Sequence, residues 1–190
     1  MAQNFSNLTG KILIATPYAM EGNVFHKSMI YMIQHGEEGS VGLIFNRPIN
    51  DMPEDTILKK VNESLTLPDI DLEVHIGGPL ELERGFFLHT MDYNKNTLFK
   101  SADNIHGVTS NTEIIQDIKK GNGPDHALFI LGYTGWGKGQ LEFELENNLW
   151  IIAEPDPELI FSDNPLIKWD MGLASLGVLT NEFIPQVGNC

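Results

Sequence analysis

Apolar residues occur in short runs along this chain, and most of the runs are bounded by glycine, proline, asparagine or aspartate. This pattern is typical of many short β-strands. It predicts strands at residues 11–16, 28–35, 41–45, 72–76, 85–89, 105–108, 127–131 and 150–153. The second and third runs flank Gly36-Glu37-Glu38-Gly39, which predicts a β-hairpin whose acidic tip lies in solvent.

Between and after these strands, apolar residues recur at helical spacing in several segments. This spacing predicts helices at 53–61, 111–120, 140–147, 157–161 and 165–176, the last two with proline at an early position. Segment 140–147 is ambiguous because Leu141, Phe143 and Leu145 alternate with glutamates as they would in a strand. Its good helix formers, and the interval of four from Leu141 to Leu145 to Leu149, favour a helix.

The order of these elements predicts the fold class. The strands come in adjacent groups and do not alternate strictly with helices, which favours an α+β fold over a doubly wound sheet. A chain of 190 residues, 42% hydrophobic and without a linker segment, is expected to form a single domain over residues 1–190.

Charge and cysteine content narrow the possible partners. The formal net charge is −14 and the 12 Lys and Arg residues are not clustered, so direct nucleic-acid binding is disfavoured. The one cysteine, Cys190, cannot form an internal disulfide, which fits a reducing compartment. We see no secretory signal and no apolar run long enough to span a membrane, so we expect a cytoplasmic protein.

The segment 132–139 has the G-x-x-x-x-G-K core of a phosphate-binding loop between a predicted strand and a predicted helix. A phosphate loop needs Ser or Thr after the lysine to hold Mg²⁺, and Gly139 stands at that position. Nucleotide binding is therefore one alternative. The other is that the glycines allow a sharp turn over which Trp136 packs.

The second glycine-rich segment, Gly77-Gly78-Pro79, precedes Arg84 and His89. A pocket with Arg84, an imidazole and exposed backbone amides is conceivable there. In the structural alternative, Arg84 pairs with a local carboxylate and His89 ends an edge strand. The histidines lack the spacing of a zinc site.

Three glutamates in the segment 140–147 could supply a carboxylate pair for acid and base catalysis. On a helix, Glu142 and Glu146 share one face and Glu144 points roughly opposite. The alternative is a solvated acidic surface.

Three blocks resemble the YqgE/AlgH family of uncharacterised bacterial proteins. They are HGEEGSVGLIFNRP (35–48), GGPL with RGFFLH (77–80 and 84–89) and LGYTGWGKGQLE (131–142). The resemblance covers nearly the whole chain. It implies one α+β domain with a curved, partly barrel-like, mainly antiparallel or mixed sheet flanked by helices. Some members carry the label of transcriptional regulator, but this sequence has no helix-turn-helix or basic helix to support direct DNA binding.

We therefore interpret the chain as a non-catalytic binding module or an indirect regulatory module, with a small anion or a protein as partner and no cofactor or metal. The candidate ligand-binding residues are Asn46, Gly77, Gly78, Arg84, His89, Gly135, Trp136 and Gly137. One alternative is a hydrolase-type enzyme that uses His89 or His35 with a nearby glutamate. The other is a nucleotide binder through residues 132–139.

Overall fold

The computed structural model describes residues 7–17, 24–51 and 71–178, and the helix predicted at 53–61 lies outside these ranges. The strands are β1 (Ile12–Ala15), β2 (Met29–Gly36), β3 (Gly39–Ile44), β4 (Val74–Ile76), β5 (Leu80–Thr90), β6 (Phe99–Lys100), β7 (His106–Thr109), β8 (Ala127–Trp136) and β9 (Trp150–Ala153). The helices are η1 (Ile49–Asp51), α2 (Glu113–Lys119), α3 (Gln140–Glu146), α4 (Pro157–Ile160) and α5 (Pro165–Ser175). Among the described residues, no helix is long and apolar enough to cross a membrane.

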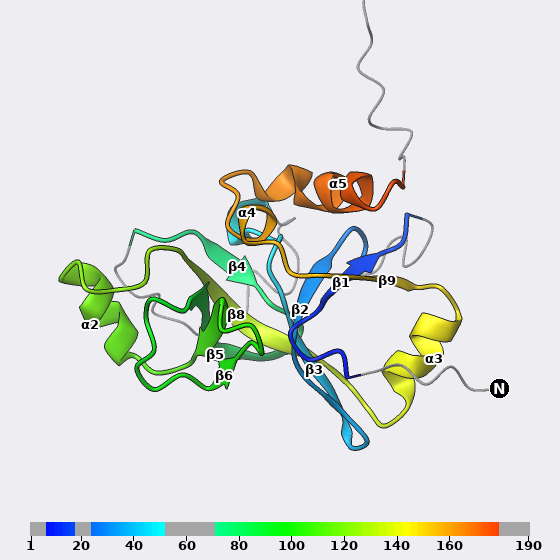
Figure 1. Ribbon diagram of the computed structural model, residues 1–190, viewed down its shortest axis with the longest axis horizontal. Helices are drawn as coiled ribbons and strands as arrows, with labels where there is room; N and C mark the ends of the chain where they lie inside the picture. Colours follow the sequence, from blue (N-terminus) through cyan, green and yellow to red (C-terminus); the bar gives the residue numbers. More distant parts are fainter. Residues whose placement is uncertain (1–6, 18–23, 52–70, 179–190) are drawn as a thin grey trace, which may run out of the picture.

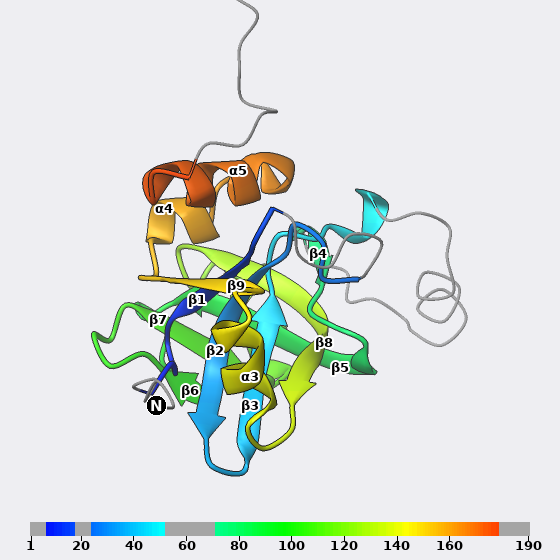
Figure 2. The same cartoon turned by 90° about the vertical axis from the view of Figure 1, so that its right-hand side faces the viewer.

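The strands form one mixed sheet in the order β6-β7-β5-β8-β3-β2-β1-β9, in which every neighbouring pair is antiparallel. Strand β4 lies off this path and pairs with β8 in parallel. The sheet curves strongly but does not close into a barrel (Figures 1 and 2). The predicted α+β class and the curved, mainly antiparallel sheet are confirmed.

Helices α4 and α5 cover one side of the curved sheet (Figure 1). Their buried residues join Tyr31, Phe45 and Phe86 in the largest apolar cluster. Trp169 of α5 is 3% exposed, and its indole N–H donates to the carbonyl of Ala15 at 2.8 Å. Helix α5 is thereby fixed to β1.

Helix α3 packs against the other side of the sheet, in front of β2 and β3 in Figure 2. Leu141 and Leu145 are its buried residues, which confirms the helical interpretation of the ambiguous segment. The expectation of a wholly solvated acidic surface is wrong for Glu144. Its Oε2 accepts the indole N–H of Trp136 at 2.8 Å and that of Trp150 at 2.7 Å.

Two strands are longer than the sequence predicts. Strand β8 continues through residues 132–136, for which the glycines predict a turn, because Gly135 and Trp136 pair with Val41 and Ser40 of β3. Strand β5 begins at Leu80. Gly135, which favours a turn in isolation, is held in the strand by its pairing with Val41, whereas Gly132 keeps a left-handed φ of +70° within β8.

Candidate functional site

A large bulge interrupts the pairing of β5 with β8. Leu80 pairs with Tyr133 and the next pair joins Gly85 to Leu131, so β5 advances five residues while β8 advances two. Four residues of β5, 81–84, therefore lie opposite a single residue of β8, so β5 has three extra residues at this point. Glu81 lies among them with φ +45°, in the left-handed region that non-glycine residues rarely adopt. Bulges and backbone outliers of this kind are concentrated at functional sites.

The bulge borders an open groove of about 330 Å³, which we call the Arg84 groove. Its lining comes from β2, β3, β5, β8 and the region of β6: Ile33, Gln34, Val41, Arg84, Phe86, Leu98, Phe99 and Tyr133. Small-molecule pockets span roughly 300–1,000 Å³ and combine apolar walls with a few polar groups. The Arg84 groove matches the lower end of that range.

Arg84 is the one cation among the residues that line this groove. Its Nη1 lies 3.4 Å from Glu81 Oε2, and both side chains are 47% exposed. The other oxygen of Glu81 accepts the hydroxyl of Tyr133 at 2.8 Å, and this hydrogen bond raises the pKa of Tyr133. The bulge thus places a guanidinium, a carboxylate and a phenol together at the rim of an apolar groove.

Three of the residues predicted from sequence lie at or near this groove. Arg84 lines it, and Gly135 pairs with Val41, which also lines it. Gly78 packs against the backbone of Tyr133 with φ +154°. Trp136 does not join them, because its side chain is 6% exposed within the apolar cluster of α3. The structure therefore does not bring Arg84 and Trp136 to one surface.

Asn46, Gly77 and Gly137 have local structural contacts. Asn46 accepts the backbone N–H of Met29 at 2.8 Å and donates to the carbonyl of Lys27 at 2.9 Å. Gly77 donates to the carbonyl of Leu131 at 2.8 Å, and the N–H of Gly137 donates to Gln140 Oε1 at 3.1 Å. Asn46 and Gly77 fasten loops to the sheet, and Gly137 begins the turn into α3.

His89 does not end an edge strand as predicted, because β5 lies between β7 and β8 and His89 pairs with residues of both. The side chain is fully buried. Nδ1 lies 2.9 Å from the carbonyl of Thr90 and Nε2 lies 2.9 Å from Thr109 Oγ1. Burial lowers the pKa of His89, so the neutral form is favoured. Both ring nitrogens are occupied, which leaves none to act on a substrate.

His35 is the other histidine considered as a catalytic base. Its Nδ1 accepts the backbone N–H of Leu8 at 3.2 Å, and its Nε2 lies 3.1 Å from Glu142 Oε1. A pairing of His35 with a nearby glutamate does occur. However, a general base needs a free lone pair facing the substrate, and the lone pair of Nδ1 is used by Leu8. The contacts instead connect β2 to α3 and to the segment before β1.

The G-x-x-x-x-G-K segment does not form a phosphate loop. Residues 132–136 are part of β8, and the turn between β8 and α3 consists of Gly137, Lys138 and Gly139. A phosphate loop surrounds the anion with consecutive backbone N–H groups, and a paired strand cannot do so. Within the described ranges, no group of three or more His, Cys, Asp or Glu side chains is placed to hold a metal ion.

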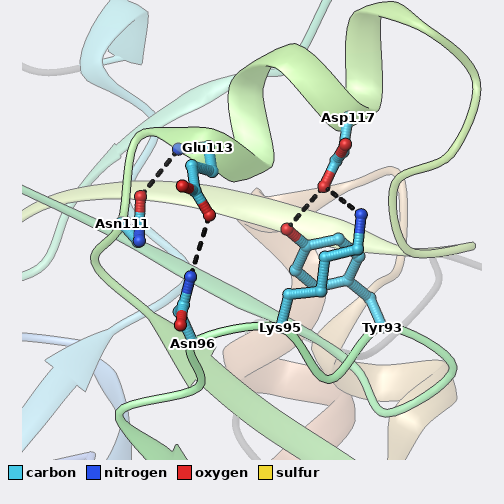
Figure 3. A network of polar contacts seen from close by, with 6 residues as sticks. All are labelled: Tyr93, Lys95, Asn96, Asn111, Glu113 and Asp117. Carbon is cyan, nitrogen blue, oxygen red and sulfur yellow. Dashed lines mark hydrogen bonds and ion pairs between the residues drawn. The ribbon is translucent and has the colours of Figure 1, made fainter.

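A polar network fastens α2 to the segment after β5 (Figure 3). Asp117 Oδ2 accepts from the hydroxyl of Tyr93 at 3.0 Å and from Lys95 Nζ at 2.9 Å. On the same helix, Glu113 Oε2 accepts from Asn96 at 2.8 Å. The Tyr93 ring also meets the His89 ring edge-on at 5.6 Å. His89 therefore belongs to the packing beneath this network.

Asp117→Asn is expected to lower the pKa of Tyr93, which burial and then the hydrogen bond to Asp117 raise to about 12. The pKa should remain above 10, because burial is the larger cause and persists. Titration of Tyr93 followed by NMR of its ring carbons measures the change. Glu113→Gln is the matched control and should have a smaller effect, and equal effects would contradict this assignment.

A second buried ionisable group, His75, should make the free energy of unfolding depend on pH in the acid range. His75 is 1% exposed, and burial, followed by the nearby charge of Lys168, lowers its pKa to about 4. The unfolded chain binds the proton near pH 6.5, so stability contributed by neutral His75 is complete above that pH and is lost as pH falls toward 4. With His75→Gln, the free energy of unfolding should fall less steeply between pH 6.5 and 4. The difference in slope should correspond to about one proton fewer taken up on unfolding. Urea unfolding at several pH values tests this, and identical slopes would contradict it.

Sequence reasoning missed most of the groove. Glu81, Tyr133 and Phe99 were not singled out, although Glu81 and Arg84 stand three residues apart and Tyr133 lies within the glycine-rich block. The signal that was available is the run of charged residues between Leu80 and Gly85, in a strand that is otherwise apolar. Charged residues in such a run indicate that this part of the strand is exposed to solvent, although they do not reveal the bulge.

The fold and the groove define a class of one-domain mixed α/β proteins with a curved, open sheet and an apolar groove beside the bulge of β5. The family model described as AlgH-like matches residues 12–181, and this chain belongs to that family. UPF0301 proteins from Rickettsia felis and Rickettsia africae are each 48% identical to it over 185 residues, which cover 97% of this chain and 97% of each relative.

Two solved structures share the fold. The solution structure of AlgH from Pseudomonas aeruginosa, a UPF0301 protein, has a TM-score of 0.71, 30% identity and full coverage of both chains. The crystal structure of protein DIP2367 from Corynebacterium diphtheriae has a TM-score of 0.66 and 22% identity, and the match covers 92% of this chain and 90% of that one. The second likeness concerns the fold alone.

Proposed function

We propose that this protein is a non-catalytic binding module whose ligand occupies the Arg84 groove. The observation that carries this proposal is the bulge between Leu80 and Gly85, which interrupts a well-paired central strand and places Arg84 over an apolar groove. Irregular backbone inside a sheet loses hydrogen bonds, and the left-handed residue Glu81 adds strain of about 1–3 kcal/mol. A ligand-binding role would explain why the protein has this destabilising arrangement.

The properties of the two candidate histidines support binding over hydrolysis. His89 is buried with both nitrogens occupied, and the Nδ1 lone pair of His35 is used by a backbone N–H. Neither histidine lines the Arg84 groove. Any regulatory effect of the protein would then follow from occupation of the groove, and direct contact with DNA is disfavoured by the net charge of −14. We also propose that the protein acts in the cytoplasm.

The proposal is tested by NMR with uniformly ¹⁵N-labelled protein and a set of small neutral, anionic and cationic aromatic fragments. We expect the shifted amide signals to cluster around Ile33, Val41 and Phe86. Val41→Trp should fill the groove and abolish the shifts. Ile167→Trp, at a 40% exposed position on α5, is the matched control and should leave them unchanged.

Two results would overturn the proposal. In the first, fragments at millimolar concentration shift no signal around the groove. In the second, the shifts survive Val41→Trp unchanged, which would place the fragments elsewhere on the protein.

A further inference from the structure

We infer that the ligand of the Arg84 groove is a small aromatic monocarboxylate, an inference that rests on the proposed binding function. The first argument concerns the guanidinium of Arg84. Its contact with Glu81 is 3.4 Å long, whereas charge-assisted N–H···O bonds are about 2.7–2.9 Å, and both side chains are 47% exposed. This ion pair is loose and solvated. A carboxylate that binds Arg84 through two parallel hydrogen bonds would form the stronger contact.

The walls of the groove favour an aromatic body for this ligand. The Arg84 guanidinium lies 5.1 Å from the centre of the Phe86 ring, and Tyr133 meets Phe86 edge-on at 6.3 Å. Phe99 adds a third ring to the lining, and Leu98, which is 54% exposed, leaves the opening partly uncovered. A flat ring in this space can make the edge and offset contacts that aromatic groups prefer, with its carboxylate on Arg84.

The charges around the groove favour a ligand with a single negative charge over a phosphate monoester. Arg84 is the one cation in the lining, while Glu81 and Glu83 on the same bulge are exposed carboxylates. A monocarboxylate can replace Glu81 on Arg84, and Glu81 keeps its hydrogen bond from Tyr133. A phosphate monoester would add a second negative charge beside two carboxylates on a chain of net charge −14, and like charges at this range repel.

Isothermal titration calorimetry with three ligands of one shape tests the inference: 2-naphthoate, 2-naphthyl phosphate and 2-naphthalenemethanol. At fixed ionic strength, we expect 2-naphthoate to bind about ten-fold more tightly than the neutral alcohol and the phosphate. Arg84→Gln should reduce the affinity for 2-naphthoate to that for the alcohol. Lys138→Gln removes one positive charge at an exposed position outside the groove and should change that affinity by less than about two-fold.

The outcomes separate this inference from the proposed function. If the alcohol binds as tightly as 2-naphthoate and Val41→Trp abolishes both, the groove binds ligands and the carboxylate inference is wrong. Tighter binding of the phosphate, or equal effects of Arg84→Gln and Lys138→Gln, would also overturn the inference. If none of the three ligands binds and the fragment set shifts no groove signal, the proposed function fails as well.

Discussion

Gly78→Ala is expected to reduce the free energy of unfolding by about 4 kcal/mol, from overpacking and backbone strain together. Gly78 has φ +154°, and a Cβ added there would collide with the backbone carbonyl of Tyr133. The obstacle is β8 itself, a central strand that cannot move without breaking its pairing with β5 and β3. Urea unfolding followed by tryptophan fluorescence measures the loss.

Gly121→Ala is the matched control for this substitution. Gly121 has φ +74° after α2, and a Cβ there would meet nothing within 4 Å. Gly121→Ala should therefore lower the free energy of unfolding only by the strain of a left-handed backbone, about 1 kcal/mol. If Gly78→Ala were no more destabilised than Gly121→Ala, the close approach of Gly78 to β8 would be wrong. Gly78 would then be available for the ligand contact that the sequence predicted.

Glu144→Ala is expected to destabilise the protein by about 3 kcal/mol, because it leaves two buried indole N–H groups without an acceptor. Trp136 and Trp150 are 6% and 4% exposed, and both donate to the same carboxylate oxygen. Loss of the charged acceptor should loosen α3 from the sheet. Glu144→Gln should be less damaging, since its amide oxygen remains an acceptor.

Glu146→Ala serves as the control on the same helix, because Glu146 is exposed. Its substitution should change the free energy of unfolding by less than about 0.5 kcal/mol. Equal effects of Glu144→Ala and Glu146→Ala would show that Glu144 belongs to the solvated acidic surface, as sequence reasoning expected.

Local sequence patterns predicted the elements whose cause is local. The helix at 140–147 followed from good helix formers and from Leu141 and Leu145 four residues apart, and both leucines are buried. The hairpin of β2 and β3 followed from the glycines that bound its acidic tip, and Gly36 pairs with Gly39 as expected. Short-range chemistry fixed these elements, so no knowledge of distant partners was needed.

Features set by distant partners could not be predicted in the same way. Residues 132–136 have the composition of a turn, and residues 133–136 are held in β8 because β3 and β5 pair with them. Glu144 accepts hydrogen bonds from both Trp136 and Trp150 only because these residues, which belong to β8 and β9, lie next to each other in the fold. Similarly, the site at Arg84 required a mismatch in register between β5 and β8, which no pattern within either strand reveals.

Binding in the Arg84 groove is tested most directly by an isotope-filtered nuclear Overhauser measurement between the ring protons of 2-naphthoate and the methyl groups of ¹³C-labelled protein. If the ligand occupies the Arg84 groove, contacts are expected to Ile33, Val41 and Leu98, which come from separate segments and meet there. Contacts confined to other exposed methyl groups, such as those of Ile167 and Met171 on α5, would contradict the assignment of this groove as the binding site.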